Sequence, residues 1–496
     1  MARNDTPNDG SGGSGLSDRQ RRRLTRRPSD RAIVATLAFT GLVAAFMQTL
    51  VTPIIPELPT LLHATSADAS WVLTVTLLAA AIATPIAGRL GDMFGKRRLV
   101  LVLLAALFIG SVISALSDTL IPMLVGRALQ GFGLGAIALG ISILRDVLHA
   151  KSLGGAVALV SATLGVGGAI GLPLSAVIAE NFSWHALFWL AALLALVAAA
   201  LVLFIVPVST LRAGGRFDYL GSVLFAIGLT GILLAVSKGT EWGWGSPVTL
   251  GLLIGGVLVL LGWGAFQLRI PSPLIDLRIA ARRPVLLTNL ASIAVGFGFF
   301  VSSAALPQLL ELPTATGVGL GQTLLVASLC LMPSGLVMFF MSPVAARLSA
   351  ARGPRTSLLL GLLIIVITYA AAIPLMTEVW HAILIATVLG FGVGFAYAAM
   401  PTLIMHAVPA SETAAANGLN SVMRTLGSTV SATVVGVVLS ANLVMADGRG
   451  IPTKGAFQTV FLVGAAVAVA GFVLALFIPR HEPRYETASI PVQQAR

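Results

Sequence analysis

Fourteen long apolar runs, separated by short segments rich in Gly, Pro and charge, constrain this sequence more than any other feature. One membrane-spanning helix needs about 20 apolar residues, so fourteen helices would take up about 280 residues. Of the 496 residues, 57% are apolar and 10% are charged, whereas a soluble domain carries about 25% charged residues. The sequence therefore predicts an all-α polytopic membrane protein and excludes soluble enzymes, secreted disulfide scaffolds and disordered proteins.

Pro, Gly and charged residues mark the ends of the predicted spans. The spans are 32–55, 70–88, 98–117, 120–144, 153–179, 185–207, 218–237, 247–268, 285–306, 322–346, 356–376, 380–405, 414–441 and 456–479. The first run exceeds 20 residues and lacks a small-residue cleavage site, so we interpret it as a helix and not as a signal peptide. Residues 1–31 lack apolar periodicity and are rich in Gly, Ser, Asp and Arg, which predicts a disordered basic cytoplasmic tail that attracts anionic lipid.

The positions of the basic residues predict the orientation of the chain. With both termini and the even-numbered loops in the cytoplasm, 26 Lys and Arg residues lie on that side and 3 lie on the other, namely Lys238, Arg449 and Lys454. Cytoplasmic loops carry an excess of Lys and Arg. We therefore expect a multi-pass protein of the cell membrane with cytoplasmic termini, and we assign the net charge of +12 to topology and not to nucleic-acid binding.

Two segments of the sequence repeat each other. TPIAGRLGDMFGKR (84–97) aligns with SPVAARLSAARGPR (342–355) at an offset of 258 residues, and each closes an apolar span and opens a cytoplasmic loop. A match this short can arise by chance, because every cytoplasmic loop needs Arg and Gly. Duplication explains the sequence, the topology and the loop position together. Parallel repeats of this kind are typical of transporters whose two halves rock around a midplane site.

The first repeated segment also carries a family resemblance. GRLGDMFGKRR (88–98) resembles the loop between the second and third helices of the major facilitator superfamily, with Gly88, Asp92, Gly95 and Lys96 at matching positions. The middle Arg of the family motif is missing here. A second motif, LVGRALQGFGLG (124–135), is similar to the fourth-helix motif of the family.

Two further segments resemble one branch of that superfamily. FDYLG (217–221) and PLIDLR (273–278) flank a helix pair between two six-helix halves, as in the fourteen-helix drug–proton antiporter branch. The resemblance implies two pseudo-symmetric halves around an inserted pair and divides the chain as 1–31 (tail), 32–207 (first half), 208–284 (inserted pair and flanking loops), 285–479 (second half) and 480–496 (tail).

The same resemblance implies a function. It implies a secondary active transporter that exports small amphipathic compounds by alternating access. Its implied partners are protons and membrane lipids, and it is expected to act as a monomer without a cofactor. A facilitator, or a lipid or metabolite exporter without proton coupling, stays open as the alternative.

The resemblance also assigns a role to the repeated loop. In the family this loop latches the two halves together when the transporter is closed to the cytoplasm, partly by facing a helix N-terminus. The candidate latch residues are Gly88, Arg89, Asp92, Gly95, Lys96 and Arg97. The position equivalent to Asp92 in the second half is Ala350, so we expect a one-sided latch. A solvated surface ion pair is the alternative interpretation of this cluster.

The fifth predicted span resembles the antiporter motif of the family. Gly165, Gly167 and Gly171 give it a smooth face, with Pro173 displaced by one residue from the position that the motif has. Small residues at this spacing allow close helix approach. In the family, packing at this face controls leak. A packing role and a functional role for these glycines are therefore nearly the same interpretation.

Charges inside the spans give the remaining candidates. Arg127 and Arg424 lie within apolar runs, where a charge costs about 3 kcal/mol or more and normally faces a cavity or a partner. Arg127, followed by Gln130, is close enough to the outer end of its span to snorkel. Asp146 is the acid nearest to the membrane interior, beside Arg145; it is a candidate for proton coupling or one member of an interfacial ion pair.

The branch commonly carries an acid in its first helix, and this chain has Gln48 in that context. Because a dication in a low-dielectric cavity needs a carboxylate, we expect neutral, zwitterionic or weakly anionic cargo. The six His residues lie at span ends or in loops, and the single Cys330 cannot form an internal disulfide. These residues predict no metal site and no enzyme.

Overall fold

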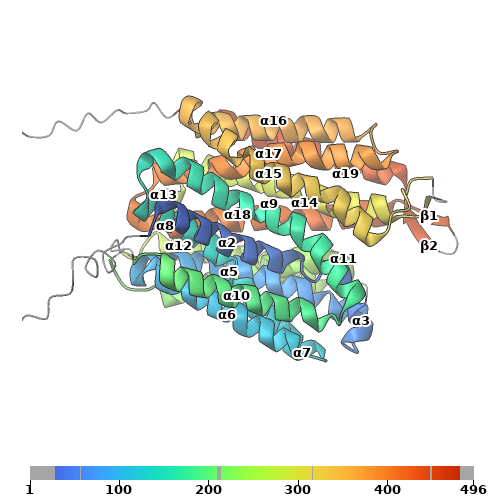
Figure 1. Ribbon diagram of the computed structural model, residues 1–496, viewed down its shortest axis with the longest axis horizontal. Helices are drawn as coiled ribbons and strands as arrows, with labels where there is room; N and C mark the ends of the chain where they lie inside the picture. The colour runs from blue at the N-terminus through green and yellow to red at the C-terminus, as the bar shows by residue number, and fades with distance from the viewer. Residues whose placement is uncertain (1–27, 56, 209–213, 315–316, 447–448, 481–496) are drawn as a thin grey trace, which may run out of the picture.

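The computed structural model describes residues 28–55, 57–208, 214–314, 317–446 and 449–480. This part of the chain contains 14 helices that are long and apolar enough to cross a membrane, which confirms the predicted fold class. Figure 1 shows them as a bundle whose helices run along the long axis of the molecule. Residues 1–27 and 481–496, which hold most of both predicted tails, lie outside the described residues.

The first half is built from six spans, the fourth of which is two consecutive helices. They are α2 (Asp30–Thr49), extended by the 3-10 turn η1 (Thr52–Ile54), α5 (Trp71–Phe94), α6 (Lys96–Ala115), α7 (Leu120–Phe132) with α8 (Gly135–Val147), α9 (Ala150–Asn181) and α10 (His185–Ile205). The short helices α3 (Leu58–Leu61) and α4 (Ser66–Ala69) link the first two spans. One cluster of buried apolar side chains runs through these helices.

The inserted pair and the second half follow. The inserted helices are α11 (Tyr219–Trp242) and α12 (Pro247–Gln267), followed by the short α13 (Leu277–Ala280). The second half comprises α14 (Arg283–Glu311), α15 (Leu324–Arg352), α16 (Pro354–Ala372), α17 (Val379–Ala407), η3 (Ala410–Glu412) with α18 (Thr413–Ala441), and α19 (Lys454–Leu476). Strands β1 (Leu443–Ala446) and β2 (Arg449–Pro452) form an antiparallel hairpin between α18 and α19, with Leu443 opposite Pro452.

The two ends of the bundle differ. The described chain begins, at α2, and ends, after α19, at the same end of the bundle, on the left in Figure 1, and the β1–β2 hairpin lies at the other end. We call the first the basic end, because it carries the Arg and Lys residues of the repeated segments, and the second the hairpin end. Small polar residues begin several helices by capping them: Ser29 accepts from Ala32 N–H, and Asp218 accepts from Gly221 N–H.

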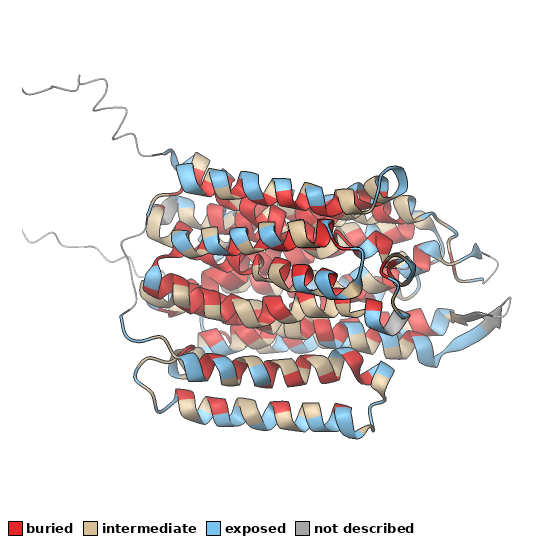
Figure 2. Ribbon diagram, turned by 90° about the horizontal axis from the view of Figure 1, so that it is seen from below, coloured by how far each residue is buried: buried red, intermediate tan, exposed pale blue. Residues whose placement is uncertain are grey.

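Apolar side chains cover the outside as well as the core. In Figure 2 the inner helices are mainly buried and the outer ones carry rows of exposed residues. α12 is the least buried span and exposes Leu258 and Leu261. Exposed apolar faces on long helices match a hydrocarbon surrounding, in which the backbone groups are satisfied within each helix.

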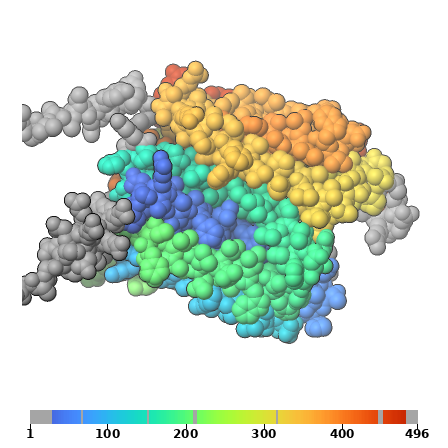
Figure 3. Space-filling view, viewed as in Figure 1, coloured from blue at the N-terminus to red at the C-terminus, as the bar shows by residue number. Residues whose placement is uncertain are grey.

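The halves meet along their length through two symmetric helix pairs. α5 of the first half packs on α18 of the second half, and α9 packs on α15. α5 and α15 are the second spans of their halves, and α9 and α18 are the fifth, so the two contacts are related by the repeat. Figure 3 shows the blue-to-green first half lying against the yellow-to-red second half. The inserted helix α11 touches both α5 and α18.

The repeated segments adopt the same local structure. Gly95 (φ 109°) links α5 to α6, and Gly353 (φ 84°) links α15 to α16, a backbone conformation that favours glycine. Arg97 then donates to the Leu203 carbonyl near the end of α10, and Arg355 donates to the Leu476 carbonyl at the end of α19, with an N···O distance of 2.6 Å in the second case. Equivalent residues thus hold equivalent helix ends.

The structure corrects the predicted end of the second span. The sequence favoured 88 as its last residue, but α5 continues to Phe94 and the turn consists of Gly95 alone. α15 likewise continues to Arg352 instead of ending at 346. A single residue at positive φ completes each connection, so no loop is needed. Asp92 therefore lies in the last turn of a helix.

Candidate functional site between the two halves

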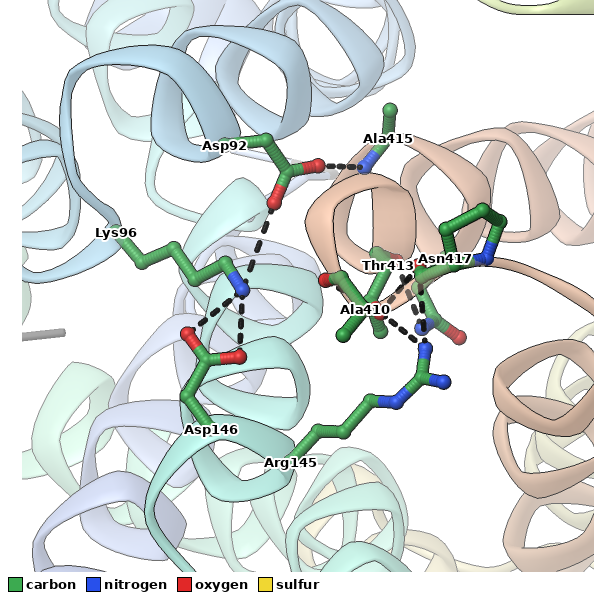
Figure 4. A network of polar contacts seen from close by, with 9 residues as sticks. Asp92, Lys96, Arg145, Asp146, Ala410, Thr413, Ala415 and Asn417 are labelled. Atoms are coloured by element: carbon green, nitrogen blue, oxygen red, sulfur yellow. Dashed lines mark hydrogen bonds and ion pairs between the residues drawn. The ribbon is translucent and has the colours of Figure 1, made fainter. Parts of the chain in front are cut away.

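Four helix ends meet at the basic end and bring three charged side chains together (Figure 4). Lys96, the first residue of α6, places its Nζ 2.7 and 2.9 Å from the carboxylate oxygens of Asp146 on α8. The same Nζ lies 3.6 Å from Asp92 Oδ1 on α5. The three side chains are 0–2% exposed, so this is a buried cluster and not the solvated pair considered above. Two carboxylates face one ammonium group.

Asp92 reaches from the first half to the second. Its Oδ2 accepts a hydrogen bond of 3.1 Å from the backbone N–H of Ala415, in the first turn of α18. The first N–H groups of a helix have no partner inside the helix, and the helix dipole favours negative charge there. Asp92, on the first half, therefore caps α18 of the second half.

Glycines allow the two backbones to meet beside this cap. A Cβ atom on Gly88 of α5 would lie 2.6 Å from the Ala414 carbonyl oxygen, and one on Gly418 of α18 would lie 2.9 Å from Pro85 Cα. Neither approach leaves room for a side chain. The α5–α18 contact is thus a backbone contact that holds the halves close at the basic end.

Arg145 makes a second connection across the halves. It donates from Nη2 to the Val408 carbonyl at 3.0 Å, from Nη1 to the Pro409 carbonyl at 3.3 Å, and to the Thr413 hydroxyl. Val408 and Pro409 follow the C-terminus of α17, where a cation is favoured. A hydrogen bond to a charged group contributes about 1.5–3 kcal/mol, so each of these bonds stabilises the contact between the two halves. The second half thus receives a carboxylate at the start of α18 and a guanidinium at the end of α17.

Sequence reasoning missed two parts of this arrangement. Arg145 was not a candidate, although it carries the second cross-half contact. Lys96 and Asp146 are 50 residues apart in the sequence, so no local pattern pairs them. Arg89, a candidate latch residue, is 7% exposed and lines a cavity of about 220 Å³ together with Asp276, Ser411 and Glu412.

Arg127 lies inside the first half and does not face a cavity. Its side chain is 1% exposed and donates to the Met47 carbonyl of α2 (3.2 Å), the Val72 carbonyl of α5 (3.3 Å) and Gln130 Oε1 (2.7 Å). Gln130 in turn donates to Ser111 Oγ at 2.8 Å. The pair connects four helices, so its placement favours a structural role over either cargo contact or snorkelling. Gln48 is partly exposed near the end of α2.

The glycines of α9 face different partners. Cβ atoms on Gly167 and Gly171 would meet Ala45 and Thr49 of α2, within the first half, whereas one on Gly165 would meet Met338 of α15, in the second half. Pro173 lies within α9, which continues unbroken to Asn181. Only Gly165 of this set therefore contributes to the contact between the halves.

Arg424, the other intramembrane candidate, lies on α18 in the second half. It donates from Nη1 to Asn420 Oδ1 at 3.0 Å and from Nη2 to Ser421 Oγ at 3.3 Å. Its guanidinium lies over the Tyr397 ring, 5.0 Å from the centroid. In the described part of the chain, no group of three or more His, Cys, Asp or Glu side chains is placed to hold a metal ion.

The paired halves, the backbone contact between them and the charged cap on one helix end define a polytopic transporter of the two-half type. The comparisons with known proteins identify its family. Residues 37–432 match the family model described as Major Facilitator Superfamily, and the chain belongs to that superfamily.

Named relatives are resistance and export proteins. The chain is 26% identical over 460 residues to the lincomycin resistance protein LmrB of Listeria monocytogenes, covering 90% of this chain and 96% of the relative. It is 27% identical over 445 residues to the tetracenomycin C resistance and export protein of Streptomyces glaucescens, covering 86% and 79%. Among solved structures, the human organic anion transporter MFSD10 (TETRAN) matches with a TM-score of 0.64 at 16% identity, over 90% of this chain and 100% of that one. That likeness concerns the fold.

Proposed function

We propose that the protein is a secondary active transporter that exports small amphipathic compounds from the cytoplasm by proton antiport and alternating access. It lies in the cell membrane as a monomer, with both termini and the basic end in the cytoplasm. The observation that carries this proposal is the hydrogen bond from Ala415 N–H to Asp92, because it joins the two halves at one end of the bundle. The resistance relatives support export of small molecules.

The positions of the contacts between the halves support alternating access. Opening the basic end separates α5 from α18, which breaks the Asp92 cap and the Arg145 bonds to the end of α17. The bond between Lys96 and Asp146 stays within the first half. The hydrogen bonds of Asp92 and Arg145 to the second half would therefore break on opening. The ion pair of Lys96 and Asp146 would remain, so these two charges would stay paired when the halves separate.

A buried carboxylate oxygen of Asp92 without a hydrogen bond in the described part of the chain supports proton coupling. Both oxygens of Asp146 accept hydrogen bonds from Lys96, whereas Asp92 Oδ1 is buried and accepts no hydrogen bond among the described residues. A proton on Asp92 Oδ1 would remove the negative charge of this carboxylate and weaken the cap on α18. Proton uptake would then favour opening of the basic end.

A susceptibility panel in a drug-sensitive bacterial host tests export. Cells that express the chain should tolerate higher concentrations of several antibiotics and dyes, and everted membrane vesicles should accumulate these compounds when a proton gradient is imposed. A protonophore should abolish accumulation. Accumulation that continues unchanged with the protonophore would support the alternative, a facilitator or a lipid or metabolite exporter without proton coupling.

A further inference from the structure

Arg424 places a positive charge deep inside a membrane span. It lies 11 residues after Thr413, the first residue of α18, which corresponds to about 16 Å along the helix axis. More than half of α18 continues beyond it. Intramembrane charges are costly and mark substrate or ion pathways when no partner neutralises them.

The protein groups around Arg424 are neutral. Its hydrogen-bond acceptors are the Asn420 amide and the Ser421 hydroxyl, and the Tyr397 ring covers one face of the guanidinium. Asn420 is itself fixed, because its Nδ2 donates to Asn289 Oδ1 at 3.0 Å and to Ser292 Oγ at 2.6 Å on α14. Among the described residues, no Asp or Glu forms an ion pair with Arg424.

The contrast with Arg127 shows that Arg424 is incompletely satisfied. Both arginines lie within spans. Arg127 is 1% exposed and donates to three oxygen atoms, which belong to α2, α5 and its own helix α7. Arg424 is partly exposed and uses two of its five N–H donors on its own helix. Among the described residues the other three N–H donors have no acceptor, and they point outward in the guanidinium plane, whereas the Tyr397 ring covers one face of that plane.

From this arrangement we infer that Arg424 and Tyr397 bind the acidic group of the cargo, and that the cargo class includes aromatic organic monoanions. A guanidinium edge binds a carboxylate or sulfonate through two parallel hydrogen bonds. Tyr397 orients the guanidinium, and Phe299, whose ring centroid lies 6.2 Å from that of Tyr397, extends the aromatic surface for the body of the ligand. This inference rests on the proposed export function and names the substrate class of that transporter.

Three small probes with one aromatic scaffold test the inference. Naphthoate carries a negative charge, naphthamide is its neutral isostere, and naphthylmethylammonium is positive. Binding to the full-length protein in lipid nanodiscs is measured by calorimetry, with empty nanodiscs as the blank. We expect the wild type to bind naphthoate most tightly and the cation most weakly. Arg424→Gln should reduce the naphthoate-to-naphthamide affinity ratio by about ten- to a hundredfold, the range for a charge-assisted contact.

Two further variants separate binding from folding. Arg424→Lys keeps the charge but loses the planar donor edge, so it should keep part of the preference for naphthoate. Arg127→Gln removes the other intramembrane arginine and should leave the affinity ratio unchanged. An unchanged ratio in Arg424→Gln, or a wild type that prefers the cation, would overturn the inference while leaving export intact. If the wild type bound none of the probes and exported nothing in the susceptibility panel, both the inference and the proposed function would fail.

Discussion

Asp92→Asn tests the latch because it changes one charge and almost no volume. The wild-type carboxylate accepts a charge-assisted hydrogen bond from Ala415 N–H at the start of α18. Such bonds contribute about 1.5–3 kcal/mol, and neutral ones about 0.5–1.5 kcal/mol. Asparagine can still accept through Oδ1, so the substitution should cost the closed basic end about 1–2 kcal/mol. That cost shifts the ratio of closed to open molecules about five- to thirtyfold toward open.

Spin-label distances across the basic end measure this ratio. Arg98 on α6 and Ala351 on α15 are exposed and belong to opposite halves, so both can be replaced by cysteine and labelled. Cys330 is the single native cysteine and is replaced by alanine first. Double electron–electron resonance should show a larger fraction of long distances in Asp92→Asn than in the parent, together with slower transport per folded molecule in everted vesicles.

Asp146→Asn is the matched control. Both carboxylates are buried and both face Lys96, and Asp92 is the acceptor of the bond from Ala415 N–H of α18. We expect Asp146→Asn to lower the thermal stability of the first half and to leave the distance distribution close to that of the parent. Equal redistribution in the two variants would show that the charge of the cluster, and not the cap on α18, closes the basic end. An unchanged distribution in Asp92→Asn would refute the latch.

Four further substitutions test the packing and the charges inside the bundle. Gly335→Ala adds a methyl group where α15 meets α9 across the halves. We expect it to destabilise this contact by about 1–3 kcal/mol and to slow transport per folded molecule. Gly171→Leu, whose neighbours lie within the first half, should mainly lower the amount of folded protein. Arg127→Gln should lower the stability by about 2–4 kcal/mol in thermal unfolding, because three hydrogen bonds to two neighbouring helices and Gln130 are lost, without slowing transport per folded molecule. Lys238→Met removes the bond of 2.8 Å to Glu241 and the contact with Trp71 of α5, and it should increase hydrogen exchange at the hairpin end of α11 without opening the basic end.

The sequence predicts the spans well because hydropathy is the property that decides them. An apolar run of sufficient length has one stable form in a bilayer, a helix, whatever its neighbours are. The ends are harder to predict. Charged residues such as Arg89 and Asp92 read as a loop, but they continue α5 because their side chains are buried against other helices. Tertiary contacts, which hydropathy does not register, extend the helix to Gly95.

The partners of the charged residues were less accessible from the sequence. Arg145 and Asp146 are adjacent, so they read as one interfacial pair, but consecutive residues on a helix do not face each other. On α8, Asp146 points to Lys96 within the first half and Arg145 points to the end of α17 in the second half. Two adjacent residues of opposite charge on one helix thus bind partners in different halves. Only the helix arrangement reveals this division.

Comparing the two repeated segments distinguishes residues that both copies need for their local structure from Asp92, which is present in the first copy alone. Gly95 and Gly353 make the same turn, and Arg97 and Arg355 hold the same helix ends, so both copies keep the local structure. Ala350 stands where the first copy has Asp92, so the end of α15 offers no carboxylate to a partner helix. The carboxylate cap across the halves is therefore present in one of the two copies. We therefore expect that Asp92→Asn, which replaces the carboxylate of that copy by a neutral amide, changes the balance between closed and open molecules while both halves remain folded.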